Sequence, residues 1–372
     1  MALALSDEQR ALQETAADFL AAHGNARADR DGDGALWARI VDLGWAAVQV
    51  PEALDGLGLG AVELALLMEE MGRRLVRTPF LDNVVLAQTA VLQAGSAEAQ
   101  QRLLPALAYG ERCATLILGP GLAAAPAALS IAARRDGDGW GLDGDAAQVL
   151  DSGLCTHALV AARIDEAPGV ALFEVAADAA GLVRTPLAVW DPTRPQARWS
   201  FAAVRVTAAA RVDDPARVLA GLARTRLLAA LQVAAEQVGG AAQCLQLTVD
   251  YTRERMQFGR PVAAFQAVKH RCAEMMVRME TARSTVRAVA ARVAANSADD
   301  DALLREVGAA RVLATAAYRY CAQEAIQLHG GVGFTWEYDP QLHFKRAQWA
   351  SQWFGDCAAW REALAAQLLD AA

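Results

Sequence analysis

The chain has 372 residues, of which 54% are hydrophobic and 21% are charged. This composition is typical of a globular protein with a core large enough for two or three domains, and it excludes a long disordered chain. The formal net charge is -8, and no basic stripe occurs along the sequence. The charge therefore argues against a nucleic-acid partner.

Cysteine spacing and the N-terminal sequence indicate the cellular compartment of the protein. The six cysteines are scattered, without a C-x-x-C pair, which predicts reduced thiols in a cytoplasmic protein. The N-terminus lacks a basic region followed by an apolar core, and no run of about 18 apolar residues occurs. We therefore expect neither a secretory signal nor membrane insertion. Residues 29–34 begin like a calcium loop, but Ile40 stands at the twelfth position, so no metal site is predicted.

The first zone, residues 1–112, has helical periodicity. Ser6-Asp7-Glu8-Gln9 reads as a capping box at the start of a helix. Further helices are expected near 36–43 and 62–75, with a glycine-rich loop between them. This zone is predicted to be an α-helical domain.

The second zone, residues 113–212, loses the helical period. Short β-rich runs separated by turn residues replace it, and these are typical of a small antiparallel β domain. The expected strands lie at 114–118, 129–133, 158–162, 170–173, 198–201 and 204–206. Residues 136–139, with the sequence Asp-Gly-Asp-Gly, are predicted to form a hairpin turn.

The third zone, residues 213–372, is helical again. Long apolar-periodic stretches lie at 216–255, 265–295 and 301–328, and Asp339-Pro340 opens a last helix, because aspartate suits the N-cap and proline the first helical position. Helices of this length can pack as a four-helix bundle. The fold class is therefore α+β multidomain, in the order helices, strands, helices.

Two motifs interrupt the third zone. The segment 253–261 ends the first long helix, and its arginines could hold an anionic ligand. Taken alone, the segment is better explained as a helix-turn-helix corner. The segment 327–334 carries three glycines in four positions, which allow close approach of a ligand to the backbone. Taken alone, this second motif is also explained as a glycine-rich helix end.

Taken together, the spacing, order and flanking helices of these two motifs resemble the acyl-CoA dehydrogenase family. The segments 43–45, 50–52 and 69–73 are similar to the N-terminal domain of that family, so the resemblance covers nearly the whole chain. It implies an N-terminal α-helical domain at 1–112, a small β-barrel-like middle domain at 113–212 and a C-terminal four-helix bundle at 213–372.

The resemblance also implies a reaction. Family members oxidise an acyl-CoA thioester to the trans-2-enoyl-CoA: a carboxylate removes the Cα proton while hydride leaves Cβ for N5 of FAD. The residues expected to bind FAD, some of them on a neighbouring subunit, are Arg255, Phe258, Gln266, Gln327, Gly330 and Gly331. The implied partners are an electron-transfer flavoprotein and further subunits, in a homodimer, a homotetramer or a mixed oligomer with a paralogue.

The chain departs from the family pattern in the middle domain. The Thr-Glu-Pro and Gly-Ser-Asp signature is replaced by the stretch 116–121, and the Trp-Ile-Thr element that meets the flavin is replaced by 149–152. Ser152 could substitute for the lost flavin contact. These changes leave open a non-catalytic subunit of a mixed oligomer, and also a flavoprotein oxidase on the same fold.

The chain also departs from the family pattern at the position of the catalytic base. One branch of the family places a glutamate in a turn that falls near Phe354-Gly355 here, where Asp356 follows. Another branch places it near Ala229, and Glu236 lies two turns further along that helix. Asp356 is our first candidate and Glu236 the second. The structural alternatives are a surface aspartate in a turn and a buried acid paired with an arginine.

Overall fold

The computed structural model describes residues 4–24, 26–27, 34–119, 128–165, 169–295 and 300–370. The acidic stretch at 29–33 and residues 120–121 lie outside the described residues. The chain divides into two compact units, one of residues 1–27, 60–76 and 230–372, the other of residues 28–59 and 77–229. Both units are discontinuous in sequence. The expected domain boundaries near 112 and 212 stay a prediction.

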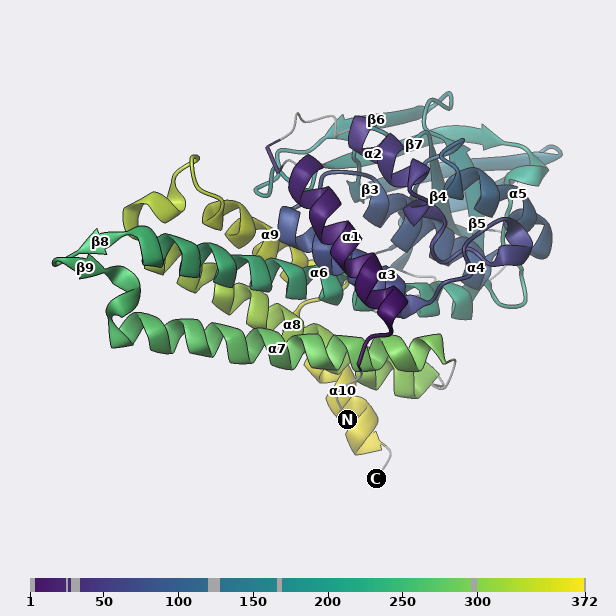
Figure 1. The fold of residues 1–372 in the computed structure, drawn as a ribbon. Coiled ribbons are helices and arrows are strands. Elements are labelled where there is room, and N and C mark those ends of the chain that lie inside the picture. Colours follow the sequence, from purple (N-terminus) through teal and green to yellow (C-terminus); the bar gives the residue numbers. More distant parts are fainter. Residues whose placement is uncertain are drawn as a thin grey trace. The chain divides into compact units, whose positions relative to one another are not determined.

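The first unit is helical. α7 and α8 run side by side, and α8 also packs against α9 and α10 (Figure 1). Its helices are α1 (Asp7–His23), α3 (Ala61–Arg74), the part of α6 (Val218–Glu254) from Ala230 onward, α7 (Gln266–Ala294), α8 (Asp300–His329), α9 (Pro340–Gln352) and α10 (Cys357–Asp370). The three long helices predicted from periodicity are confirmed, and Pro340 begins α9 as expected. The helix α10 was not predicted.

The capping box at the start of α1 is confirmed. The Gln9 N–H donates to Ser6 Oγ over 3.1 Å, and the Ser6 N–H donates to Gln9 Oε1 over 3.0 Å. These two bonds satisfy backbone donors that a helix otherwise leaves open. Gln9 Nε2 then donates to Glu63 Oε1 over 2.7 Å, which joins α1 to α3.

Glycines bring α3 and α6 into backbone contact. A Cβ added at Gly239 of α6 would lie 1.7 Å from the carbonyl oxygen of Glu69. A Cβ at Gly72 of α3 would lie 2.1 Å from the carbonyl oxygen of Glu236. Only glycine allows two helices to approach this closely, so these positions fix how α3 packs in the first unit.

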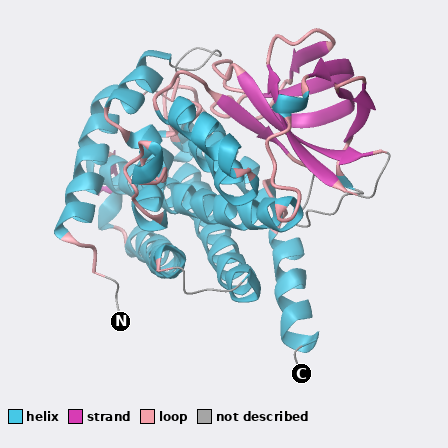
Figure 2. Ribbon diagram, turned by 90° about the vertical axis from the view of Figure 1, so that its right-hand side faces the viewer, coloured by secondary structure: helices cyan, strands magenta, loops and turns pink. Residues whose placement is uncertain are grey.

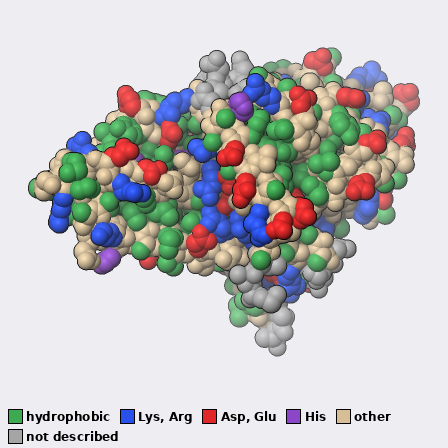
Figure 3. Space-filling model, in the orientation of Figure 1, with side chains coloured by type: hydrophobic (Ala, Val, Ile, Leu, Met, Phe, Trp, Pro, Cys, Tyr) green, Lys and Arg blue, Asp and Glu red, His purple; other side chains and the backbone are tan. Residues whose placement is uncertain are grey.

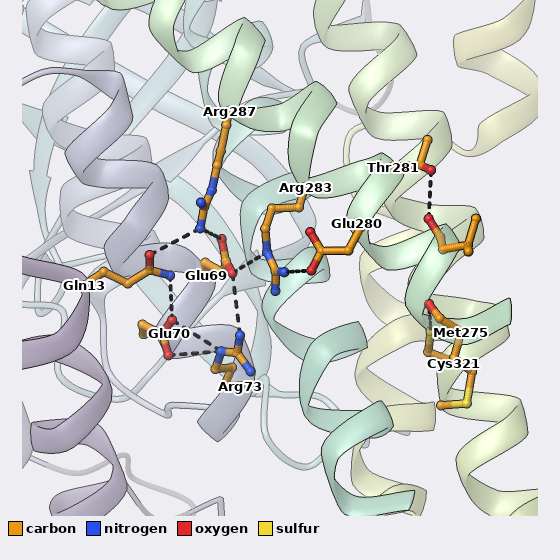
Figure 4. A network of polar contacts seen from close by, with 11 residues as sticks. Gln13, Glu69, Glu70, Arg73, Met275, Glu280, Thr281, Arg283, Arg287 and Cys321 are labelled. Carbon is orange, nitrogen blue, oxygen red and sulfur yellow. Dashed lines mark hydrogen bonds and ion pairs between the residues drawn. The ribbon is translucent and has the colours of Figure 1, made fainter. Parts of the chain in front are cut away.

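Buried charges join α1, α3 and α7 (Figure 4). The Glu69 carboxylate accepts from Arg283 Nε over 2.9 Å and from Arg287 Nη2 over 3.2 Å. Its neighbour Glu70 accepts from Gln13 Nε2 over 2.9 Å. Buried carboxylates are tolerated where such partners surround them, so this network is a structural feature of the first unit.

The second unit holds the sheet and several short helices. Its helical elements are α2 (Gly34–Asp42), the 3-10 turns at Trp45–Ala47, Glu52–Leu54 and Ala208–Ala210, the π-helix η3 (Phe80–Gln88), α4 (Thr89–Ala94), α5 (Ala97–Ala108) and the first turns of α6. All nine residues of η3 are buried. Asn83 of η3 donates to Leu107 O over 3.0 Å and accepts from the Ala114 N–H over 3.0 Å. These bonds fix η3 against α5 and the first strand.

Seven strands of the described residues form one curled sheet (Figure 2). They are β1 (Ala114–Ile117), β2 (Ile131–Asp136), β3 (Gly139–Leu150), β4 (His157–Ile164), β5 (Val170–Ala176), β6 (Leu182–Pro186) and β7 (Gln196–Val206), in the order β1-β4-β2-β3-β7-β6 with β5 also on β4. The predicted antiparallel pairing is confirmed for β2–β3, β3–β7, β4–β5 and β6–β7. It does not extend to β4 with β1 and β2, because β4 pairs in parallel with both. Turn signals reveal hairpins between neighbouring strands, and they carry no information on these non-local pairs.

Two local predictions in the sheet have different outcomes. The hairpin turn at 136–139 is confirmed: Asp136 pairs with Gly139, and Gly137 has a φ of 63°. The runs at 198–201 and 204–206 belong to one strand, β7, which passes through Ala203 at a φ of 49°. The aromatic side chains Trp140, Phe173 and Trp199 form the centre of the core under this sheet.

Helix α6 is the one helix in the described residues that is long and apolar enough to cross a membrane by length and composition. Of its most apolar window, 67% is buried within the protein, as in the core helix of a globular fold.

On the face drawn in Figure 3, acidic and basic side chains are interspersed.

Candidate functional site

A short β-hairpin separates α6 from α7, where a helix corner was the alternative. It consists of β8 (Met256–Gln257) and β9 (Arg260–Pro261). The two turn residues, Phe258 and Gly259, have positive φ values of 51° and 76°, as a type I′ turn requires. The Phe258 side chain is 90% exposed. The hairpin therefore presents an aromatic ring to the outside of the first unit.

Three side chains predicted to bind FAD have no partner within the described part of the chain. Arg255 and Gln266 flank the hairpin, and Gln327 lies on the last turn of α8; all three are exposed. None of their side chains makes a hydrogen bond or ion pair with a described residue. Their donors are therefore available to a ligand or to another subunit.

The predicted glycine motif forms a 3-10 turn at Gly330–Phe334, directly after α8. Gly330 has a φ of 65°, which favours glycine. A Cβ at Gly330 or Gly331 would meet no atom within 4 Å. Because Gly331 also has no positive φ, neither its backbone conformation nor packing by the described residues requires glycine there. Such a position suits close approach from outside.

An aromatic cluster brings the two motifs to the same end of the helices. Tyr251, one turn before Arg255, stacks on His329 with ring centroids 4.4 Å apart, and Tyr338 packs edge-on against both rings. His329 Nδ1 lies 2.7 Å from the carbonyl oxygen of Ala325. Burial lowers the pKa of His329, which favours the neutral ring. The C-terminal ends of α6 and α8 are thus held together.

The first predicted base, Asp356, follows a tight turn. Phe354 and Gly355 have φ values of 59° and 96°, and a positive φ at phenylalanine is strained backbone of the kind that concentrates at functional sites. The exposed Asp356 side chain accepts through Oδ1 from the Ala359 N–H over 2.8 Å, at the start of α10. Asp356 therefore acts as a helix cap and keeps Oδ2 accessible.

The second predicted base, Glu236, lies in the core of the first unit. Its side chain is 3% exposed and forms an ion pair with the buried Arg346 of α9. The next residue, Gln237, accepts from Arg311 Nη1 over 2.6 Å, and burial lowers the pKa of Arg311 to about 10. Glu236 is thus a buried acid paired with an arginine, which was the structural alternative to its role as the base.

The last predicted site residue, Ser152, belongs to the second unit. It follows β3 and is buried, with its Oγ accepting from the Leu154 N–H over 3.4 Å and lying 3.9 Å from Cys155 Sγ. Ser152 lines a cavity of about 10 Å³, which is close to the space that one water needs. We name it the polar cavity; its lining residues are Arg77, Thr78, Asp82, Leu150, Ser152, Thr193, Arg194 and Pro195.

Asp82, a buried carboxyl of η3 in the polar cavity, was not predicted from the sequence. Burial raises the pKa of Asp82 to about 7, Arg194 lowers it, and Asp151 raises it. Asp82 Oδ1 and Thr78 Oγ1 are buried and form no hydrogen bond within the described residues. A lone acid in the apolar run of Phe80–Leu86 was the signal that could have found it, since charge is rarely buried without a reason.

Rigid turns position the opposite wall of the cavity. Asp151 accepts from Arg184 Nε over 3.0 Å, from Trp199 Nε1 over 3.1 Å and from the Gly153 N–H over 3.1 Å. These bonds hold the backbone at Ser152. Asp191 accepts from the N–H and the hydroxyl of Thr193 over 2.9 and 2.6 Å, which fixes the turn that leads into Arg194.

Comparisons with known proteins decide the family. The profile of the acyl-CoA dehydrogenase N-terminal domain matches residues 6–111, and that of the C-terminal domain matches residues 217–369. The chain belongs to the acyl-CoA dehydrogenase family. Acyl-CoA dehydrogenase IpdE2 of Mycobacterium tuberculosis is 34% identical over 355 residues, covering 93% of this chain and 92% of that protein. Homology thus identifies the protein as an FAD-dependent acyl-CoA dehydrogenase.

Solved structures of the family match nearly the entire chain. The ChsE4–ChsE5 complex from Mycobacterium tuberculosis has a TM-score of 0.87 at 27% identity, covering 100% of this chain and 99% of the matched chain. A variant of the steroid acyl-CoA dehydrogenase Tcur3481–Tcur3483 has a TM-score of 0.85 at 29% identity, covering 98% of both. The resemblance inferred from the motifs is therefore confirmed.

The outward-facing motifs of this acyl-CoA dehydrogenase fit a large anionic cofactor. Arg255 offers a guanidinium suited to a pyrophosphate. Phe258 offers an exposed ring, and Gly331 offers backbone without a side chain. Among the described residues, neither a side-chain partner of Arg255 nor a packing or backbone constraint at Gly331 explains these two residues. The first unit therefore carries residues that could hold FAD.

Proposed function

We propose that the protein catalyses FAD-dependent oxidation of an acyl-CoA thioester to the trans-2-enoyl-CoA, as a subunit of an oligomer. The observation that carries this proposal is a set of outward-facing groups at one end of the first unit. Arg255 and Gln327 have no side-chain partner among the described residues, and Gly331 has no described atom near its Cβ position. Bound FAD supplies the hydride acceptor. An electron-transfer flavoprotein is the proposed electron acceptor.

Each residue of this set has a proposed task. Arg255 holds the pyrophosphate, and the ring of Phe258 covers the adenosine portion, with Gln266 beside them. Gln327, Gly330 and Gly331 bind the FAD of a neighbouring subunit. Shared binding of this kind requires an oligomer. We also propose that the helices from α6 to α9 form the four-helix bundle of the family, and that the curled sheet forms its barrel-like domain, with Ser152 at the flavin.

The cofactor assignment is tested with Arg255→Met. Methionine keeps much of the length of arginine and removes its charge. After incubation with FAD and gel filtration, the wild-type protein should retain the flavin absorption spectrum, and the variant should lose most of it. Arg253→Met is the matched control, since Arg253 is also exposed at the end of α6. A variant that keeps full flavin occupancy would remove Arg255 from the site.

We propose Asp356 as the base that removes the Cα proton. The strained turn at Phe354–Gly355 presents its carboxylate, and Oδ2 remains available beside the capping bond. Asp356→Asn separates catalysis from capping, because asparagine caps a helix as well as aspartate and cannot accept the proton. Flavin reduction by substrate should fall at least about 100-fold, while stability and FAD binding stay unchanged. Full activity would eliminate Asp356.

Asp356→Ser serves as the control for the cap. Serine also caps the helix and shortens the side chain, so loss of activity in both variants with unchanged stability indicates a chemical role. Glu236→Gln tests the second candidate, although it also breaks the ion pair with Arg346.

A second function is favoured by the two carboxylates themselves. Asp356 already caps α10, and Glu236 is already paired with Arg346, so each has a structural role that needs no chemistry. A non-catalytic subunit that completes the site of a paralogue fits this arrangement, and the ChsE4–ChsE5 relative is itself a complex of two proteins. Co-expression with a paralogue distinguishes the two functions. Dehydrogenase activity that needs both chains, and that persists when this chain carries Asp356→Asn, favours the non-catalytic subunit.

A further inference from the structure

Two buried thiols face each other in the second unit. Cys113 directly precedes β1, and Cys155 lies in the loop that joins β3 to β4. Their Sγ atoms are 3.4 Å apart, although the residues are 42 positions apart in the sequence. Both residues are nearly fully buried. Neither cysteine takes part in the proposed reaction, so the close approach of the two thiols needs its own explanation.

Backbone bonds hold the two cysteines in this position. The Cys113 carbonyl oxygen accepts from the Thr156 N–H over 2.8 Å and from the His157 N–H over 3.0 Å. The Thr156 hydroxyl donates to the same oxygen over 3.2 Å and accepts from the Cys113 N–H over 3.3 Å. The parallel pairing of β1 with β4 begins directly after these bonds. The sheet therefore fixes the separation of Cys113 and Cys155.

A disulfide needs only a small movement from this geometry. The S–S bond is about 2.05 Å long, so the two sulfur atoms must approach by about 1.4 Å. Rotation of both side chains about their Cα–Cβ bonds supplies this movement without displacing the strands. A second pair of buried thiols, Cys244 and Cys321 in the first unit, is arranged differently. There the Cys321 thiol donates to the Met275 carbonyl oxygen over 3.6 Å.

The loop that carries Cys155 is held by few backbone bonds. Residues 151–156 belong to no helix or strand. Within the loop, the Leu154 N–H reaches Ser152 Oγ over 3.4 Å, which is a long hydrogen bond. Segments of this kind open locally at a low free energy. Such an opening admits a molecule as small as hydrogen peroxide far more readily than a bulky thiol reagent.

We propose that Cys113 and Cys155 form an oxidative modification site, at which hydrogen peroxide converts the two thiols into a disulfide in the folded protein. The new bond fixes the loop 151–156 to the start of β1. The dithiol is the form expected in a reducing compartment, and a dithiol reductant restores it.

The chemistry takes place in two steps. One thiolate attacks a peroxide oxygen, the O–O bond breaks, and a sulfenic acid and the first water form. The second thiol then attacks the sulfenic sulfur, so that the S–S bond forms, the S–O bond breaks and the second water leaves. The two thiols together lose two electrons and two protons, and one hydrogen peroxide is reduced to two waters.

The surroundings of the pair make this reaction slow. The Cys113 thiol and burial raise the pKa of the Cys155 thiol, and the charge of Asp82 adds to this effect. A raised pKa leaves little thiolate at neutral pH, and the thiolate is the form that attacks an oxidant. The site therefore responds to sustained exposure to peroxide rather than to a brief pulse.

The test uses the full chain with the two half-buried thiols replaced, Cys272→Ser and Cys357→Ser, so that they do not consume the oxidant. The folded protein is incubated with hydrogen peroxide, the oxidant is removed with catalase, and the remaining thiols are alkylated in denaturant. Mass spectrometry without reduction should then find the tryptic peptides 113–134 and 136–163 joined in most chains.

Three controls accompany this measurement. Dithiothreitol should separate the joined peptides, because a disulfide is reducible and a sulfinic acid is not. Cys244 and Cys321 should be recovered as alkylated thiols, since they are equally buried and the Cys321 thiol is bonded to a carbonyl oxygen. Cys155→Ala should abolish the link.

A second measurement tests the effect on the loop. Hydrogen exchange of the backbone amides at 152–155 should slow after oxidation and return to its original rate after reduction. Unchanged exchange in a protein that carries the disulfide would refute the claim that the bond fixes the loop.

The mass spectra also contain the results that would overturn the site itself. These are recovery of Cys113 and Cys155 as separate alkylated thiols, their conversion to sulfinic acids, or a link that forms only in denaturant. None of these measurements needs bound flavin or an acyl-CoA, so the inference stands or falls independently of the proposed function.

Discussion

Replacing Asp82 by asparagine should make the protein less sensitive to alkaline pH. Burial raises the pKa of Asp82 from 3.8 to about 7, so the folded state keeps this proton between those values while the unfolded state loses it. The raised pKa therefore contributes stability that is fully present below pH 3.8 and is lost as pH rises to about 7. Asparagine cannot ionise, so the variant does not lose this stability.

The magnitude follows from the two pKa values. Each unit of difference corresponds to about 1.4 kcal/mol, so the wild-type protein carries a penalty of about 4 kcal/mol above pH 7 that Asp82→Asn removes. Between pH 5 and pH 8 the free energy of unfolding of the variant should rise by about 3 kcal/mol relative to the wild type. Groups that both proteins share cancel in this difference.

The assay is denaturant unfolding of both proteins at pH 5 and pH 8, with Asp138→Asn as the control for an exposed aspartate in a turn. An infrared band of a protonated carboxyl, present in the wild type and absent in Asp82→Asn, should titrate with a midpoint near pH 7. A stability difference that is the same at both pH values, together with no such band, would show that Arg194 keeps Asp82 ionised and that the reasoning on burial is wrong.

Two further predictions concern packing and thiols. Gly239→Ala should lower the free energy of unfolding by about 2 kcal/mol or more, since its Cβ would meet the carbonyl oxygen of Glu69 at 1.7 Å; Gly331→Ala, with no atom within 4 Å, should leave stability unchanged in the same unfolding assay. A thiol-reactive dye should label only the half-buried Cys272 and Cys357 in the folded protein, and rapid labelling of a third cysteine would contradict the structure.

The parts of the fold that the sequence predicts well have a strong local signal. The capping box at Ser6 and the start of α9 at Pro340 were found because each depends on side chains within one turn. The π-helix η3 was not found. All nine of its residues are buried, so the run is apolar on every side and has no stripe from which a helical period can be read.

The hairpin after α6 shows a second limit of structure prediction from the sequence. Its sequence predicts the end of a helix at Gly259, and the helix does end in this region, at Glu254. The position of Phe258 in the left-handed region was not predictable, because side chains rarely adopt it. For the same reason, the strained turn at Phe354 was not foreseen before Asp356.

The site residues also differ in whether a local sequence signal marks them. The proposed FAD-binding residues lie in two contiguous segments, so the resemblance to the family could point to Arg255 and Gly330 from the sequence. The polar cavity draws Arg77, Asp82 and Arg194 from separate elements. Only the tertiary structure, in which η3 packs against β1 and β3 pairs with β7, brings these residues together. A non-contiguous site of this kind has no motif in a single sequence, and its one local signal is the lone acid Asp82 in the apolar run of η3.

The pair of Glu236 and Arg346 allows its structural and catalytic roles to be separated. Both side chains are almost completely buried, so Glu236→Gln should cost about 3–5 kcal/mol, because it leaves the Arg346 charge without its carboxylate. The double variant Glu236→Leu, Arg346→Met removes both charges and should recover most of that loss in denaturant unfolding. If substrate reduces the FAD bound to this stable double variant at the normal rate, Glu236 is purely structural. A stable double variant without activity would instead identify Glu236 as the base and displace Asp356.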